Sequence, residues 1–130
     1  MEETWKRAIL KGSRPRVLLL CNPVNPTGII YSEETLNMCI DFAESKKMHI
    51  ICDEIYGNSI FPDEKLTSIA KLMHKRNPNT KRYMGDYVHV IAGFSKDFCV
   101  SGMRCGTLFT HNKDIIYAVE SIGLFGAVSN

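Results

Sequence analysis

Polar side chains that could share one reactive site follow three apolar segments of the sequence. In chain order they are Asn22 and Asn25 after the first segment, Asp53, Glu54 and Tyr56 after the second, and Ser95 and Lys96 after the third. Ligands of open α/β sheets bind beyond the carboxyl ends of the strands. If the three segments are neighbouring strands, these groups meet at one rim and form a site with acid, amide, phenol and amine groups.

The elements that would position these groups can be read from hydrophobic patterning. Four short apolar runs predict strands, at Val17–Cys21, His49–Cys52, Val88–Phe94 and Gly106–Thr110. The first run is wholly apolar, which is typical of a strand that is buried on both faces.

Helices are predicted between these strands. Ser32 is a good N-cap residue, and the two glutamates that follow it suit the positive end of a helix dipole. The apolar side chains of the helix that begins after Ser32 fall on one face, and they are Leu36, Cys39, Ile40 and Ala43. A short helix is expected at Leu66–Met73, and Asn112 is placed to cap a last helix.

Strands that alternate with helices predict the α/β class, here a three-layer α/β/α arrangement with a mostly parallel sheet. Parallel sheets are covered by helices on both faces, and three or so helices are too few for four strands. We therefore expect residues 1–130 to be part of a larger domain that is incomplete at both ends.

Composition narrows the function class. The chain has 130 residues, with 45% hydrophobic and 23% charged residues, as in ordinary globular proteins. A net charge of +2 gives no indication of nucleic-acid binding, and no apolar run approaches the roughly 20 residues needed to span a membrane. Five cysteines without a C-x-x-C pair favour a reducing compartment, the cytoplasm, and the four histidines lack metal-ligand spacing.

Each candidate residue also has an ordinary structural interpretation. Asn25 could belong to a simple Asn-Pro turn, Asp53 could cap a helix, and Arg104 could be a surface charge. A Ser-Lys pair such as Ser95-Lys96 is common. The functional interpretation depends on all of these residues occurring together, in order, at the ends of strands.

Four short motifs carry a resemblance to a known family. They are Asn-Pro-Thr-Gly at Asn25–Gly28, Asp-Glu-Ile-Tyr at Asp53–Tyr56, Ser-Lys-Asp-Phe at Ser95–Phe98 and Gly-Met-Arg-Cys-Gly at Gly102–Gly106. In this order they resemble the fold-type-I pyridoxal-phosphate-dependent enzymes, in the class I/II aminotransferase branch. The stretch Ser95–Asp114 is most similar to the 1-aminocyclopropane-1-carboxylate synthase group and its synthase-like relatives.

The resemblance implies a role for six residues around pyridoxal 5'-phosphate. Lys96 would form the Schiff base and then move protons as general base and acid. Asp53 would pair with the pyridine nitrogen and keep the ring an electron sink. Tyr56 and Asn25 would hydrogen-bond the ring hydroxyl oxygen. Ser95 and Arg104 would hold the phosphate, because a guanidinium matches phosphate oxygens.

Two departures from the family pattern stand out. Many relatives carry Gly at the position of Cys99, and a positive φ there costs a Cys roughly 1–2 kcal/mol. Family members are also several times longer, and they carry an upstream loop that caps the phosphate, an upstream ring-stacking aromatic and a downstream substrate-binding Arg. Nothing here matches these parts, so we expect a fragment, a truncated gene product or an incomplete gene model, inactive in isolation.

The resemblance implies an enzyme of amino-acid metabolism whose small-molecule substrate is an amino acid, with amino-group transfer through Lys96 as the first choice and a homodimer as the complete protein. A lyase of the 1-aminocyclopropane-1-carboxylate synthase type is the alternative, and a non-catalytic truncated protein of the same fold is another. A nucleotide-hydrolysing protein is a further alternative, because Ile50–Glu54 is an apolar run that ends in acids like those that hold Mg²⁺ in such enzymes. It lacks the required G-x-x-x-x-G-K-[ST] loop.

Overall fold

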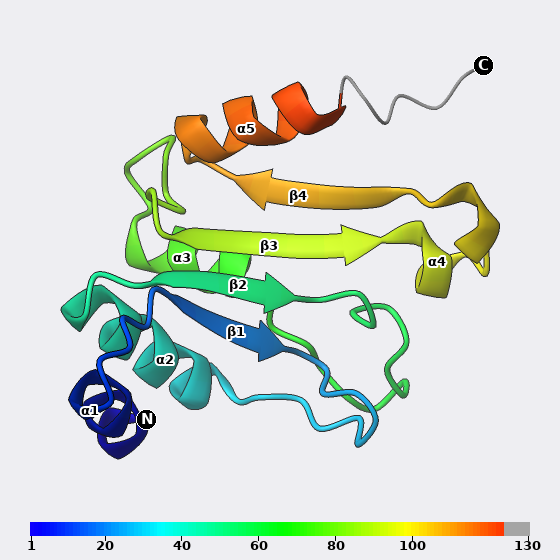
Figure 1. Ribbon diagram of the computed structural model, residues 1–130. Helices are drawn as coiled ribbons and strands as arrows, with labels where there is room; N and C mark the ends of the chain where they lie inside the picture. Colours follow the sequence, from blue (N-terminus) through cyan, green and yellow to red (C-terminus); the bar gives the residue numbers. More distant parts are fainter. Residues whose placement is uncertain (124–130) are drawn as a thin grey trace.

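A computed structural model of the chain, which describes residues 1–123, contains one four-stranded sheet with the order β1-β2-β3-β4 (Figure 1). The strands are β1 (Val17–Cys21), β2 (His49–Asp53), β3 (Val88–Gly93) and β4 (Gly106–Thr110). The first three strands pair in parallel, and β4 pairs antiparallel with β3. The predicted α/β class and mostly parallel sheet are confirmed.

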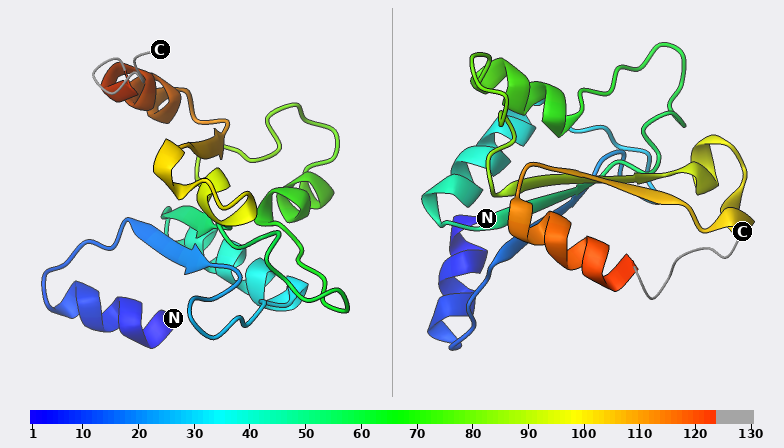
Figure 2. Two further views of the ribbon diagram at one scale, coloured as in Figure 1. Left: turned by 90° about the vertical axis from the view of Figure 1, so that its right-hand side faces the viewer. Right: turned by 90° about the horizontal axis from the view of Figure 1, so that it is seen from above.

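Helices connect the strands. They are α1 (Glu2–Leu10), α2 (Glu33–Ser45), α3 (Ile69–Arg76), the single turn α4 (Phe94–Asp97), the 3₁₀ turn η1 (Ser101–Met103) and α5 (Lys113–Gly123). Helices α2 and α3 lie side by side on one face of the sheet, and α1 lies next to α2 (Figures 1 and 2). In residues 1–123, no helix is both long and apolar enough to cross a membrane.

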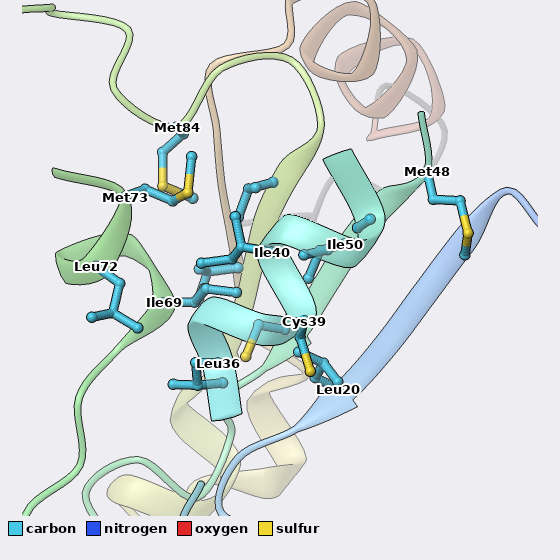
Figure 3. Packing of buried hydrophobic residues seen from close by; sticks show 14 residues of the cluster. Leu20, Leu36, Cys39, Ile40, Met48, Ile50, Ile69, Leu72, Met73 and Met84 are labelled. Atoms are coloured by element: carbon cyan, nitrogen blue, oxygen red, sulfur yellow. The ribbon is translucent and has the colours of Figure 1, made fainter. Parts of the chain in front are cut away.

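The predicted apolar face of α2 forms the centre of the core (Figure 3). The Ser32 hydroxyl accepts a hydrogen bond from the Thr35 backbone N–H at 3.2 Å, and so starts the helix as expected. Leu36 and Ile40 are completely buried. The strands and α3 contribute the facing side chains, which are Leu20, Ile50, Cys52, Val88, Val90, Ile69, Leu72 and Met73. Together they place α2 and α3 firmly on one face of the sheet.

The prediction that β1 is buried on both faces was wrong. Leu20 is buried, whereas Val17 and Leu19, which point to the other face, are 48% and 67% exposed. In the part of the chain that the structure describes, α2 and α3 cover only the first face. The sequence of β1 is therefore typical of a strand with helices on both faces, whereas in residues 1–123 helices pack against only one face of it.

Two predicted boundaries also differ from the structure. The helix expected from Leu66 begins at Ile69, because the Ser68 hydroxyl accepts from the Ala70 N–H and acts as the N-cap. The third strand ends at Gly93, and Phe94 opens the turn α4. Asn112 caps α5 as predicted, since its side-chain oxygen accepts from the backbone of Asp114.

A chain of hydrogen bonds crosses the sheet at the opposite end from the predicted site. His49 Nδ1 lies 2.9 Å from His89 Nε2, and His89 Nδ1 lies 2.7 Å from Thr110 Oγ1. Burial, together with the neighbouring His49, lowers the pKa of His89, while Asp86 acts in the opposite direction. The neutral imidazole is therefore the form that the folded chain prefers at this position.

We expect this arrangement to make the fold sensitive to acid. The unfolded chain takes up the His89 proton at the ordinary histidine pKa of about 6.5, whereas the folded chain does so only at lower pH. The contribution of His89 to the free energy of unfolding is thus complete above about pH 6.5 and is lost as the pH falls toward the lower folded pKa. Urea unfolding at pH 7.5 and pH 5 measures this loss.

The variant His89→Asn, whose amide can still bond Thr110, should show a smaller loss between these two pH values. The quantity compared is the change in the free energy of unfolding between pH 7.5 and pH 5, so a difference in overall stability between the two proteins does not affect it. An equal change in the two proteins would show that His89 is not the responsible group.

Candidate functional site

Parallel pairing brings the polar residues after β1, β2 and β3 to the same edge of the sheet. Cys21 at the end of β1 is in register with Asp53, and Asp53 is in register with Ile91 of β3. The loop after β1, the segment after β2 and the turn α4 therefore occupy one rim (Figure 1). The sequence-based expectation that the three strand ends converge is confirmed.

Three of the six predicted residues meet on this rim. The Asn25 side-chain amide donates a long hydrogen bond, 3.5 Å, to the hydroxyl oxygen of Tyr56. The Lys96 Nζ lies 5.5 Å from the centre of the Tyr56 ring. Asn25 and Lys96 are exposed and Tyr56 is half-buried, so a ligand can reach all three. An amide, a phenol and a primary amine thus surround one accessible point.

Asp53 lies at the carboxyl end of β2 and is half-buried. One carboxylate oxygen, Oδ1, accepts from the backbone N–H of Ile55 at 3.0 Å. Within residues 1–123 the other oxygen, Oδ2, makes no hydrogen bond. This bond fixes the carboxylate on the rim and leaves Oδ2 to accept a hydrogen bond from a ligand.

Ser95 lies before the turn η1 in the chain and Arg104 directly follows it, but the structure does not join them. Ser95 lies in α4 and is half-buried. The exposed Arg104 guanidinium donates to the backbone oxygen of Ser101 at 3.2 Å. Among the described residues no hydrogen bond links the Ser95 and Arg104 side chains. Their shared role in holding a phosphate therefore stays a prediction.

The loop between Lys96 and Arg104 has two residues in the left-handed region. Cys99 has a φ of +54° and Arg104 has a φ of +52°. The family pattern predicts a strained backbone at Cys99 if its φ is positive, and the structure shows that its φ is positive. Cys99 therefore carries the backbone strain that a Gly would avoid.

A contact that sequence reasoning missed ties α4 to the segment after Tyr56. The Asn58 side-chain amide donates to Asp97 Oδ2 at 2.9 Å, and Asp97 directly follows Lys96. The pair holds the turn that carries Lys96 against the segment that carries Tyr56. The only signal in the sequence was the third residue of the Ser-Lys-Asp-Phe motif, for which no role was predicted.

A cavity of about 440 Å³ lies beside the rim, between the Asn25 loop and the segment after β2. It is lined by Thr27, Gly28, Ile29, Ile30, Ser59, Ile60, Phe61 and Glu64. None of the six predicted residues lines it. The predicted residues instead form an open, solvent-facing rim.

Glu54 has a structural use. Its Oε1 accepts from the backbone N–H of Ile69 at 2.9 Å and satisfies the first turn of α3. Burial raises the pKa of the neighbouring Cys52 thiol, which stays protonated and inert. No group of three potential metal ligands occurs in residues 1–123. These observations give no support to the rival idea of a Mg²⁺-dependent nucleotide hydrolase.

The family of the chain follows from comparison with known proteins. Residues 1–130 match the family "Aminotransferase class I and II" over their whole length. The chain belongs to this family of pyridoxal-phosphate-dependent enzymes.

Individual relatives place the chain more closely. It is 43% identical over 129 residues to the human protein named "Probable inactive 1-aminocyclopropane-1-carboxylate synthase-like protein 2", covering 99% of this chain and 22% of that protein. It is 35% identical over 120 residues to 1-aminocyclopropane-1-carboxylate synthase 2 of rice, covering 92% of this chain and 24% of that protein. The chain thus spans about a quarter of the length of these relatives.

A solved structure supports the fold assignment. The aromatic aminotransferase of Pyrococcus horikoshii superposes with a TM-score of 0.65 at 27% identity. The match covers 86% of this chain and 27% of the aminotransferase. The four-stranded sheet therefore matches part of the large domain of fold-type-I pyridoxal-phosphate enzymes.

The structural use of Glu54 can be tested by Glu54→Ala. Loss of the acceptor would leave the buried N–H of Ile69 without its partner, and we expect the free energy of unfolding to fall by about 1–2 kcal/mol. Urea denaturation measures the change. Glu64→Ala, which changes an exposed glutamate in the same connecting segment, is the matched control and should have almost no effect. Equal stability of the two variants would contradict the assignment.

The strain at Cys99 can be tested by Cys99→Gly. Glycine adopts a positive φ at little cost, so the variant should gain about 1 kcal/mol in the free energy of unfolding, partly reduced by the greater freedom of its unfolded chain. Cys99→Ala removes the thiol but keeps the Cβ, and should gain nothing. A gain in both variants would show that the thiol, and not the backbone, is the source of the effect.

Proposed function

We propose that this chain anchors pyridoxal 5'-phosphate in an enzyme that acts on an amino acid by amino-group transfer. The observation that carries the proposal is the meeting of Lys96, Tyr56 and Asn25 on one accessible rim. Family membership supplies the cofactor class. This chain spans about a quarter of the length of its relatives. The whole protein would act as a homodimer on an amino acid.

The side chains present fit the chemical groups of this cofactor. The cofactor supplies an electron sink for the substrate when it is bound. The Lys96 amine would hold it covalently, and Oδ2 of Asp53 would accept a hydrogen bond from the protonated ring nitrogen and so keep it protonated. Tyr56 and Asn25 would donate to the ring hydroxyl oxygen, for which their mutual contact orients them.

The remaining two residues complete the fit. Ser95 and Arg104 would hold the phosphate, since hydroxyl and guanidinium groups donate well to its oxygens. Once a substrate amine has taken its place, Lys96 would carry a proton on Nζ and move it between substrate atoms. The Asn58–Asp97 bond would keep the turn of Lys96 close to Tyr56 during these steps.

Two alternatives are supported by particular relatives. The 35% identity to the rice synthase supports a lyase that closes a ring on an S-adenosylmethionine-like substrate. The 43% identity to a human protein named as probably inactive supports a non-catalytic protein that keeps the fold. Both alternatives share the cofactor anchors. Product analysis with the full-length protein separates the two reactions, and binding without turnover would identify the non-catalytic case.

The proposal predicts that pyridoxal phosphate labels one lysine. The purified chain, mixed with the cofactor and reduced with borohydride, should carry the label at Lys96 when its peptides are mapped. Lys96→Ala should lose at least most of this label, because no other amine lies against Tyr56 in the described structure. Visible absorbance of the lysine-bound cofactor gives a second measurement.

The matched control is Lys65→Ala, which removes an exposed lysine from the segment after β2. It should leave both the label at Lys96 and the absorbance unchanged. Equal labelling of surface lysines, with no preference for Lys96, would contradict the proposal for this chain.

A further inference from the structure

Asn22 is a buried polar residue that the predicted set of six does not include. It is the first residue after β1, and its side chain is 0% exposed. Its backbone N–H donates to the backbone oxygen of Asp53 at 2.9 Å. Its side-chain oxygen accepts from the backbone N–H of Tyr31, also at 2.9 Å. One residue thus joins the end of β2 to the far end of the loop that follows β1.

The loop that Asn22 closes carries Asn25 at its exposed part. Inside the loop, the Val24 N–H donates to Ile29 at 2.8 Å, and the Gly28 N–H donates to Val24 at 2.7 Å. Gly28 has a φ of +73°, which favours glycine. These bonds shape the loop, while the Asn22–Tyr31 bond closes its base and fixes it relative to the strands.

The chemistry of the buried amide supports a specific use for its oxygen. The Tyr31 N–H can only donate, so it sets the orientation of the amide and leaves the Nδ2 donor directed elsewhere. Among the described residues this Nδ2 has no hydrogen-bond partner. The oxygen is therefore the part of this amide that bonds within the described chain.

We propose that Asn22 is a positioning residue that holds the Asn25 amide on the Tyr56 hydroxyl and at a fixed place relative to Asp53. The inference rests on the proposed function, since it treats Asn25, Tyr56 and Asp53 as cofactor ligands. Asn22 acts through the loop and touches no ligand itself. Removal of its side-chain oxygen releases the base of the loop, and the Asn25–Tyr56 contact is lost with it.

The first test needs no cofactor. In nuclear magnetic resonance spectra of the wild-type chain, the Asn25 side-chain amide should show a contact with the Tyr56 ring. Asn22→Ala should lose this contact and expose the Tyr31 amide to faster hydrogen exchange. Asn22→Asp keeps an acceptor oxygen and should retain both features. Ser32→Ala, which weakens the neighbouring cap of α2, should leave the Asn25–Tyr56 contact in place.

The second test measures whether Asn22 acts through Asn25. Asn22→Ala should raise the dissociation constant for pyridoxal phosphate roughly tenfold, the size expected from one lost hydrogen bond. In an Asn25→Ala background the same change should have little further effect, because the group that it positions is already absent. Full additivity of the two changes would overturn the proposal.

The two tests separate the possible failures. If no variant, wild type included, binds the cofactor, the proposed function fails for this chain while the spectroscopic contact still decides the role of Asn22. If Asn22→Ala keeps the Asn25–Tyr56 contact, Asn22 does not position Asn25 whatever the cofactor does. Should Asn22→Ala not fold, Asn22→Ser, whose shorter side chain cannot reach Tyr31, takes its place in both tests.

Discussion

The parallel register of β1, β2 and β3 is the constraint on which the rest of the molecule depends. Because Cys21, Asp53 and Ile91 are aligned across the sheet, the segments that follow these strands begin at the same edge. Backbone bonds continue the alignment beyond the strands, as between the Asn22 N–H and Asp53 and between the Glu54 N–H and Ile91. Reactive side chains from distant parts of the sequence meet because the backbone is already paired there.

The hydrophobic core between the sheet and the helices α2 and α3 keeps the strands in this register. A one-residue slip of β2 would turn Ile50 and Cys52 away from α2 and bring the half-exposed Ile51 and Asp53 beneath it. Burying a carboxylate against Leu36 and Ile40 is unfavourable, so packing and register support each other. Asp53 ends β2, and it faces away from α2 because Ile50 and Cys52 of the same strand belong to the core.

Local chemistry explains which features could be predicted from the sequence. Ser32 and Asn112 cap helices through contacts within a few residues, and each strand follows from a run of apolar side chains. The contacts Asn22–Tyr31 and Asn58–Asp97 could not be predicted, since they join residues whose meeting depends on tertiary structure. The exposure of Leu19 was also not predicted. An apolar strand sequence indicates that the strand is suited to burial on both faces, but it does not show whether both faces are packed against helices.

The backbone strain in the loop after Lys96 is relevant to whether the candidate site binds a ligand. Cys99 and Arg104 both adopt a left-handed backbone, which a glycine would adopt at lower cost. Strain of this kind persists where surrounding structure or function requires the side chain. A glycine at 104 would remove the strain and also the cation at this end of the rim, whereas Cys99 makes no hydrogen bond within residues 1–123. Arg104 is therefore the strained residue whose side chain has a chemical reason to be kept, which under the proposed function is the phosphate that its guanidinium would hold.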